Sequence, residues 1–274
     1  MDPLAALQNR VLACERCPRL IQYCRQIAQQ KRRMYRDQEY WGKPVPSFGD
    51  PKAKLLVLGL APAAHGGNRT GRIFTGDRSG DFLFRALYEA GFSNQPESRH
   101  RGDGLELRGC YITAALHCAP PANKGTPAEF RNCRPYLEEE LSLLKNVRAV
   151  LALGKLAFDT YLKIVFSNPT PAPPQLGRGT DVISSQQIGR GAHTESSPPR
   201  MGRGRGGGEV GKLPPRASFH FGHGASYAMP GGWPRLFASY HPSQQNTQTG
   251  KLTPKMMRQV LNGIRSYLDK MSTQ

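Results

Sequence analysis

The chain has 274 residues, enough for one sizeable domain with a buried core, or for one domain with a flexible extension. Its 38 Lys and Arg against 20 Asp and Glu give a formal charge of +18, which attracts polyanions: nucleic acid first, an anionic membrane surface second. No apolar run approaches the roughly 20 residues that span a bilayer. The start, Met1-Asp2-Pro3-Leu4, lacks the basic and apolar regions of a signal peptide, so we expect a cytoplasmic protein.

Alternating helical and strand patterns follow one another along most of the chain. Apolar residues at helical spacing predict helix over 4–30, interrupted at Pro18, and a basic, aromatic and irregular segment follows at 31–50. Continuous apolar runs, typical of strands buried on both faces of a parallel sheet, lie at 54–60, 110–115, 149–153 and 236–240. Helical patterns lie at about 80–90, 127–145, 155–166 and 254–270, the last with Thr253 as N-cap. The sequence therefore predicts an α/β fold, a three-layer α/β/α sandwich with a central four-stranded parallel sheet.

Residues 168–216 break this pattern with runs of Pro, Gly, Ser and Arg, a composition that cannot bury a core. We predict a single domain over 1–274 that is interrupted by a disordered insertion at 168–216. Its Arg-Gly repeats suit weak contacts with nucleic acid, and a solvated linker without a binding role is an equally good interpretation.

Six cysteines in a reducing compartment indicate metal ligands or buried thiols before disulfides. A CxxC motif near the start and two cysteines around the connection between the second strand and the next helix are candidates to converge on one site. These are Cys14, Cys17, Cys118 and Cys133. Soft thiolates suit zinc or an iron–sulfur cluster, and the spacing alone does not choose between them. The alternative is small buried hydrophobes, our interpretation of Cys24 and Cys110, which lack matching partners.

A glycine-rich turn at 59–77, GLAPAAHGGNRTGRIFTGD, directly follows the first strand, where open α/β sheets bind ligands. It lacks the dinucleotide pattern GxGxxG, and Arg72 replaces the lysine of a Walker motif, so nucleoside triphosphates are disfavoured. Taken alone, Phe74 is better interpreted as a core residue and Asp77 as a helix cap.

His241-Pro242-Ser243 follows the fourth predicted strand and precedes a polar loop at 244–248. His241 is suited to donate a hydrogen bond into the same crevice, although a structural hydrogen bond is the plainer interpretation of one histidine.

Taken together, these segments resemble the family 5, or type B, uracil-DNA glycosylases of the uracil-DNA glycosylase superfamily. The resemblance covers about 4–164 and 217–270. The turn at 59–77 is similar to the family's first motif, and CAPPANK at 118–124 and HPS at 241–243 are similar to later motifs.

Ala63 and Ala64 distinguish family 5, because other families have a polar or acidic residue in this motif. The insertion and His117, where Arg or Lys is expected, depart from the family pattern. Relatives hold a 4Fe–4S cluster with four cysteines in this layout. The resemblance therefore implies a 4Fe–4S cluster on Cys14, Cys17, Cys118 and Cys133.

The resemblance implies a monofunctional DNA glycosylase that hydrolyses the N-glycosidic bond of uracil in DNA and so starts base excision repair. The catalytic candidates are Asp77, which orients water and stabilises the sugar cation, His241, which donates to the base oxygen, and Asn123, which holds water or base. The base-binding candidates are Gly59, Leu60, Ala61, Ala63, Ala64 and Phe74. The DNA-contact candidates are Arg69, Arg72, Lys124, Ser243, Gln245 and Asn246.

The expected partner is double-stranded DNA with uracil or other deaminated bases. We expect the protein to be a monomer and to have no membrane partner. Other families read uracil with an Asn on the second strand, whereas Ile112-Thr113-Ala114 here has none, so we expect hypoxanthine and xanthine to be accepted. The alternatives are a uracil-restricted family 4 glycosylase, a non-catalytic iron–sulfur DNA-binding protein, and a zinc-bearing nucleic-acid module.

Overall fold

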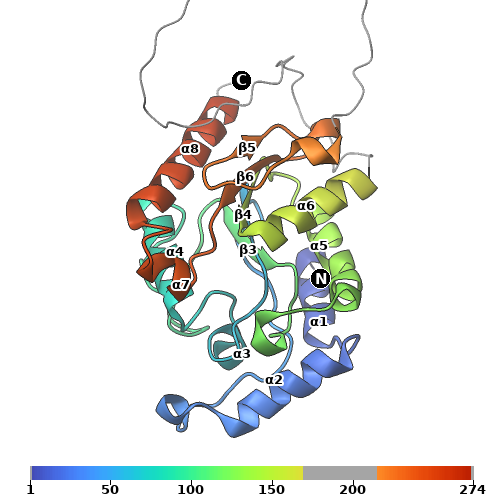
Figure 1. Ribbon diagram of the computed structural model, residues 1–274, viewed down its shortest axis with the longest axis vertical. Coiled ribbons are helices and arrows are strands. Elements are labelled where there is room, and N and C mark those ends of the chain that lie inside the picture. The colour runs from blue at the N-terminus through green and yellow to red at the C-terminus, as the bar shows by residue number, and fades with distance from the viewer. Residues whose placement is uncertain (1, 169–214, 273–274) are drawn as a thin grey trace, which may run out of the picture.

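A mixed sheet runs through the centre of the molecule, with helices on both faces (Figure 1). The computed structural model describes residues 2–168 and 215–272, so the insertion predicted at 168–216 lies almost wholly outside the described residues. In the described residues the strand order is β1-β3-β2-β4-β6-β5. The strands are β1 Phe48–Gly49, β2 Leu55–Gly59, β3 Cys110–Ala114, β4 Ala149–Leu153, β5 Ser226–Tyr227 and β6 Arg235–Ser239.

The four inner strands are parallel, and the edge strands β1 and β5 pair antiparallel with β3 and β6. The predicted three-layer sandwich and its four parallel strands are confirmed. The two edge strands were not predicted, because each pairs over only two residues and has no apolar run of its own.

The predicted helices are present. The helices are α1 Pro3–Leu12, α2 Pro18–Gln30, α3 Gly67–Thr70, α4 Arg78–Glu89, α5 Pro127–Leu143, α6 Lys155–Ser167, α7 Gln244–Gln248 and α8 Pro254–Ser272. The helix predicted over 4–30 forms two helices, and two short helices, α3 and α7, are additional. Short 3₁₀ turns are η1 Arg33–Tyr35, η2 Pro121–Asn123, η3 Arg216–Ser218 and η4 Pro230–Gly232. Pro18 opens α2, as a proline at a first helical position does. The polar loop predicted at 244–248 is wrong: Ser243 caps a helical turn by accepting from Asn246 N at 3.3 Å.

Each inner strand is buried on both faces because successive side chains point to opposite helical layers. On β2, Leu56 and Leu58 pack with α1, α5 and α6, whereas Leu55 and Val57 pack with α4 and α8. Fully burying one such side chain stabilises the fold by about 1.5–3 kcal/mol. This two-sided burial is the physical reason for the continuous apolar runs in the sequence.

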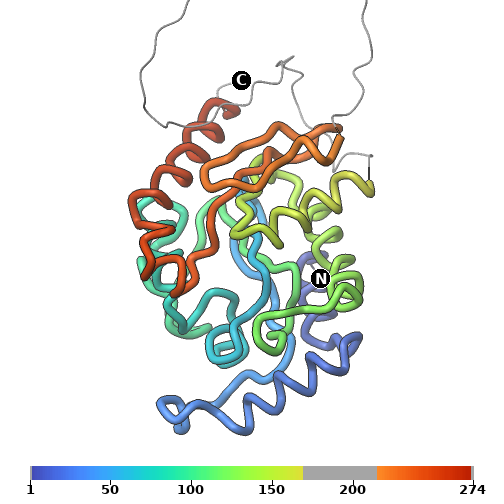
Figure 2. The backbone as a smooth tube through the Cα atoms, viewed as in Figure 1, coloured from blue at the N-terminus to red at the C-terminus, as the bar shows by residue number. Residues whose placement is uncertain are grey.

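The carboxyl ends of the parallel strands lie at one edge of the sheet, toward the end of the molecule that carries α2 and α3 (Figure 2). A third apolar cluster forms there, between α2 and the segment after β3, with Leu20, Ile21 and Leu116 at its centre. No described helix is long and apolar enough to cross a bilayer. The cytoplasmic location stays a prediction.

Candidate active site

The first and last sequence motifs meet at the carboxyl edge of the sheet. The ring centroid of Phe74 lies 5.8 Å from that of His241, with 33° between the ring planes. Gly59, at the end of β2, lets the Phe74 ring approach, since a Cβ there would stand 2.8 Å from its Cε2. Gly154, after β4, also adjoins His241, but a Cβ there would stand 3.4 Å from the histidine Cβ, an ordinary contact distance. The absence of a side chain at Gly59 is therefore what allows the Phe74 ring to lie beside His241.

Asp77 caps α4 and also faces the glycine-rich loop. Its Oδ1 accepts a hydrogen bond from Gly80 N at 2.9 Å. Its Oδ2 lies against Gly66, where a Cβ would stand only 2.1 Å away. Burial raises the pKa of Asp77, against the hydrogen bonds from the backbone of Ser79 and Gly80, which lower it. The cap predicted for this residue is confirmed, and it orients the carboxylate toward the loop that follows β2.

His241 is partly exposed and uncharged at neutral pH. Burial lowers the pKa of His241 to about 4, so its ring donates through a single N–H. Its backbone carbonyl accepts from Asn246 Nδ2 at 2.8 Å, and Ser243 caps the turn that follows. Ser243 and Asn246 thus hold the turn that positions His241, while Gln245 is exposed.

Asn123 and Lys124 lie exposed at η2, in the connection that follows β3. Asn123 has φ of 58°, and its backbone N–H donates to Pro120 O at 3.1 Å. The carbonyl of Lys124 accepts from Arg19 Nη2 at 3.2 Å. Both side chains are thus open to solvent beyond the carboxyl end of β3. Their proposed roles toward water, base and phosphate stay predictions.

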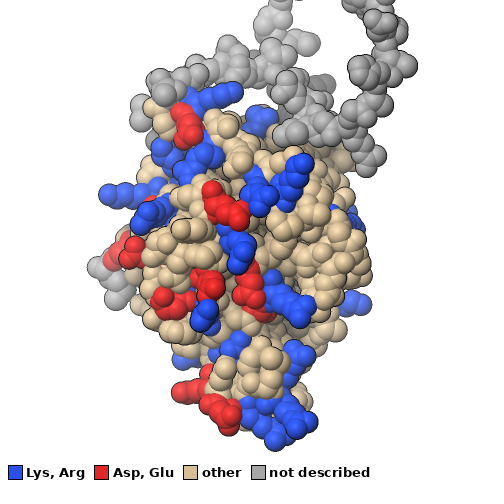
Figure 3. Space-filling model, turned by 90° about the vertical axis from the view of Figure 1, so that its left-hand side faces the viewer, with Lys and Arg blue, Asp and Glu red and all other residues tan. Residues whose placement is uncertain are grey.

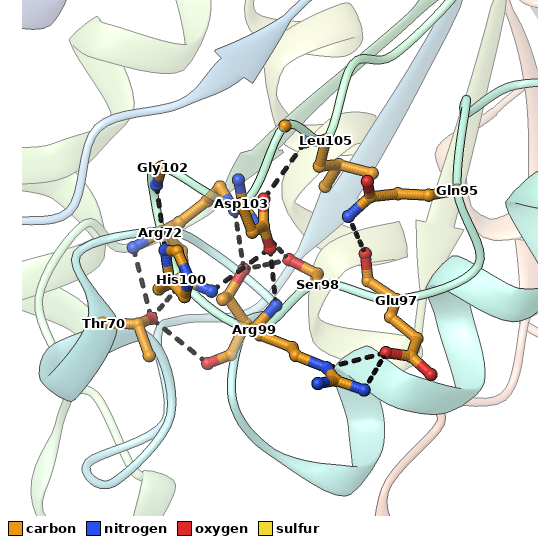
Figure 4. Close-up of polar contacts among 12 residues, drawn as sticks. Thr70, Arg72, Gln95, Glu97, Ser98, Arg99, His100, Gly102, Asp103 and Leu105 are labelled. Atoms are coloured by element: carbon orange, nitrogen blue, oxygen red, sulfur yellow. Dashed lines mark hydrogen bonds and ion pairs between the residues drawn. The ribbon is translucent and has the colours of Figure 1, made fainter.

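Arg72 is buried and paired inside the protein (Figure 4). Its Nη2 lies 2.6 Å from Asp103 Oδ2 and 2.7 Å from Ser98 Oγ, and its Nε donates to Thr75 Oγ1 at 3.0 Å. Burial opposes the ionisation of Asp103, but hydrogen bonds from Arg72 and from backbone N–H groups hold the pKa of this carboxyl well below its usual range. Arg72 therefore cross-links two loops, and its predicted phosphate contact would require breaking this pair.

Arg69 is likewise turned inward, with 9% of its surface exposed. It donates to His65 O at 2.8 Å and to Gly76 O at 2.7 Å, and it also binds the side chain of Gln38. Its guanidinium lies 3.9 Å from the ring centroid of Tyr35. These contacts give Arg69 a structural part in closing the loop between β2 and α4.

Thr113 belongs to a buried polar network and does not face the carboxyl edge. Its hydroxyl donates to Glu140 Oε2 at 2.6 Å and accepts from Ser47 Oγ at 2.8 Å. The other oxygen of Glu140 accepts from Gln8 Nε2 at 2.9 Å. The only polar side chain of the stretch 112–114 is therefore engaged between the sheet, α1 and α5.

The four candidate ligand cysteines line one pocket: Cys14, Cys17, Cys118 and Cys133. Two amide groups donate to their sulfurs, His117 N to Cys133 Sγ at 3.4 Å and Asn132 Nδ2 to Cys17 Sγ at 3.6 Å. The His117 side chain also lines this pocket; its Nδ1 bonds to Val45 O at 2.8 Å, while its buried Nε2 has no partner among the described residues. In the described part of the chain, no three His, Cys, Asp or Glu side chains form a group that would hold a single metal ion.

The remaining cysteines, Cys24 and Cys110, are fully buried, as predicted. Cys24 lies beside Cys118 and donates to Ala119 O at 3.7 Å. It therefore packs behind Cys118 and does not itself line the pocket.

Packing connects this pocket to the glycine-rich loop. Ala61 and Ala64, which are base-binding candidates, pack against the apolar cluster that includes Leu116 and Cys118. Asn68, in α3, donates to Cys24 O at 3.2 Å. The loop that follows β2 thus rests directly on the wall of the cysteine pocket.

Residues 31–50, to which the sequence assigned no role, contribute to the site. Tyr40 is buried, and its hydroxyl lies 3.0 Å from Nδ1 of His65 in the first motif. The Trp41 ring packs on Gly71, where a Cβ would stand 2.8 Å away. The available signal was the interleaving of aromatic and basic residues in this segment.

Residues 46–265 match the family model described as Uracil DNA glycosylase superfamily. The chain belongs to this superfamily. It is 42% identical to a type-5 uracil-DNA glycosylase of Thermus thermophilus over 95% of this chain and 96% of that relative. It is also 42% identical to a type-5 enzyme of Pyrobaculum aerophilum over 92% of this chain and 88% of the relative. A type-4 uracil-DNA glycosylase of Archaeoglobus fulgidus is 30% identical over only 41% of the chain. The predicted resemblance to family 5 is confirmed.

Proposed function

We propose that this chain is a type-5 uracil-DNA glycosylase, a monomer that hydrolyses the N-glycosidic bond of uracil in double-stranded DNA and so starts base excision repair. The observation that supports this most is the contact between Phe74 and His241, whose ring centroids lie 5.8 Å apart, with Phe74 three residues before Asp77 in the same loop. It joins the two motifs that the chemistry needs. The nearly full-length similarity to type-5 enzymes supports the same reaction.

The base must first leave the stack, which costs a few kcal/mol and least for a mispaired base such as uracil opposite guanine. Phe74 offers an aromatic contact to the extruded base, and the backbone of residues 60–64 offers hydrogen bonds to its polar edge. Because Thr113 is engaged with Glu140, the end of β3 supplies no polar side chain to select uracil. Hypoxanthine and xanthine are therefore further substrates in this proposal.

Hydrolysis attaches a water oxygen to C1′ of the sugar and breaks the bond from C1′ to the base nitrogen. Positive charge develops on the sugar, and the ionised Asp77 stabilises it, orients the water and accepts its proton. Negative charge develops on the leaving base, and the neutral His241 donates a hydrogen bond to the base oxygen. In this proposal Asn123 holds water or base. The reaction moves no electrons.

We propose a 4Fe–4S cluster in the cysteine pocket, because its set of four cysteine thiols suits iron–sulfur ligation. Cys14, Cys17, Cys118 and Cys133 supply the thiolates, and amide donors point at two of the sulfurs, as is usual around such clusters. When bound, the cluster supplies a cross-link and no electrons to hydrolysis. The cysteines themselves would join the α1–α2 turn to α5 and to the end of β3. Iron and sulfide analysis with a broad absorbance near about 400 nm supports the cluster, and zinc without iron contradicts it.

The function is tested with purified protein and duplexes that carry a single uracil, hypoxanthine or xanthine, followed by alkali to cleave abasic strands. Strand cleavage at uracil is the expected result. Duplex binding without abasic product would favour a non-catalytic DNA-binding protein. Efficient removal of uracil with almost no activity on the other two bases would favour a uracil-restricted enzyme.

A further inference from the structure

The contacts of Arg69 and Arg72 leave open which side chains hold the DNA backbone. Both guanidinium groups are buried and hydrogen-bonded inside the protein. An enzyme that extrudes a nucleotide must still hold the strand in register, and it does so mainly through contacts with phosphates. The cations suited to this task are exposed and rigidly attached to the loop that receives the base.

One surface of the molecule meets both conditions, and we call it the basic rim. It consists of the exposed side chains Arg32, Arg33, Arg36, Lys43 and Arg101. The stretch 31–43 holds five basic and two acidic residues, a clear local excess of positive charge. In Figure 3 the lower end of the molecule, where α2 and the following segment lie, carries a group of Lys and Arg side chains next to acidic ones.

Three aromatic residues attach the basic rim to the base-binding loop. The Tyr35 ring lies under Arg69, at 3.9 Å from guanidinium to centroid. The Tyr40 hydroxyl hydrogen-bonds to His65 Nδ1 at 3.0 Å. The backbone N–H of Trp41 donates to Arg69 O at 2.9 Å. The segment is therefore continuous with the first motif and has little freedom to move away from it.

The cations of the basic rim are also brought close to one another and to the site. Lys43 Nζ and the Arg101 guanidinium lie 4.3 Å and 4.5 Å from the same Trp41 ring centroid. Both cations are thus held against Trp41, the residue whose backbone is hydrogen-bonded to the loop that receives the base. The backbone N–H of Arg32 donates to the Tyr40 hydroxyl at 3.3 Å, and this hydroxyl is also hydrogen-bonded to His65.

We propose that the basic rim binds the phosphates of the DNA strand beside the nucleotide whose base enters the site. The occupant is duplex DNA because the surface is positively charged and attached to the base-binding loop. This inference rests on the proposed function for its substrate. In this proposal the phosphate contacts on this side of the site are made by the exposed cations of the basic rim and not by Arg69 and Arg72.

The test compares two triple variants with the same loss of charge. The rim variant is Arg32→Gln, Arg33→Gln and Arg36→Gln. The control variant is Lys52→Gln, Arg108→Gln and Lys145→Gln, exposed cations before β2, β3 and β4 at the opposite edge of the sheet. Binding to a duplex with an uncleavable abasic-site analogue is measured by fluorescence anisotropy over a series of KCl concentrations. Thermal unfolding establishes that each variant is folded.

Each phosphate contact that is lost should reduce the slope of log K against log [KCl] by about 1, so the rim variant should lose about 3. The control variant should keep the wild-type slope within about 0.5. Equal slopes for the two variants would overturn the proposal, as would a wild-type slope in the folded rim variant. Because the probe is uncleavable, the binding result is independent of excision. Absence of uracil removal by the wild-type chain would instead count against the proposed function alone.

Discussion

Gly66→Ala tests whether the position of the Asp77 carboxylate limits the reaction. A Cβ at residue 66 would stand 2.1 Å from Asp77 Oδ2, and Cβ contacts under 3.0 Å essentially never occur. The carboxylate, the loop or both must therefore move by about 1 Å in total. A misplacement of about 1 Å in a catalytic group typically costs about 10²-fold in rate. We expect the single-turnover rate of uracil excision to fall by about that factor.

The assay is single-turnover excision with enzyme in excess, combined with binding to an uncleavable duplex and thermal unfolding. Gly263→Ala is the matched control, because a Cβ at this position in α8 meets nothing within 4 Å. It should keep the wild-type rate and stabilise the helix by about 0.5–1 kcal/mol. A wild-type rate in folded Gly66→Ala would refute the assignment of Asp77. So would a loss of DNA affinity large enough to account for the whole fall in rate.

Further predictions concern the carboxylate, its titration, the cysteines and the buried network. Asp77→Ala should lower the single-turnover rate by about 10²-fold or more with DNA affinity retained, and a wild-type rate would end the assignment. Asp77 acts in its ionised form and burial raises its pKa, so the wild-type excision rate should fall on acidification at a higher pH than an exposed aspartate would give. His241, with a pKa of about 4, becomes protonated only at low pH. An acid side of the pH–rate profile that is unchanged in Asp77→Ala would contradict this. Cys14→Ser should reduce bound iron and the melting temperature, and full iron content would remove this cysteine from the ligand set. Thr113→Val should cost about 1–3 kcal/mol in urea unfolding, because it leaves Glu140 with a missing donor, and an unchanged free energy would show that the network compensates.

The sequence predicts the parallel core of the fold because burial on both faces leaves an unmistakable apolar run. It does not predict α7, since a five-residue polar helix has no apolar periodicity and depends on its Ser243 cap. Residue type alone predicts exposed side chains at Arg69 and Arg72, because basic residues are usually exposed. Their burial depends on partners distant in the sequence, such as Asp103 for Arg72. Similarly, the contribution of Tyr40 depends on its contact with His65, a partner that lies in another segment. Candidate site residues in local motifs can thus be found from the sequence, whereas contacts that depend on long-range pairs cannot.

The packing of the cysteine pocket explains how the proposed cluster, which takes no part in hydrolysis, would still affect it. Ala61 and Ala64 rest on the apolar cluster that contains Cys118, so movement of that cysteine displaces the loop that receives the base. The small size of both alanines permits this close packing. Loss of the proposed cluster from the pocket should therefore lower the excision rate. A loss of affinity with an unchanged rate would place the cysteine pocket among the DNA contacts.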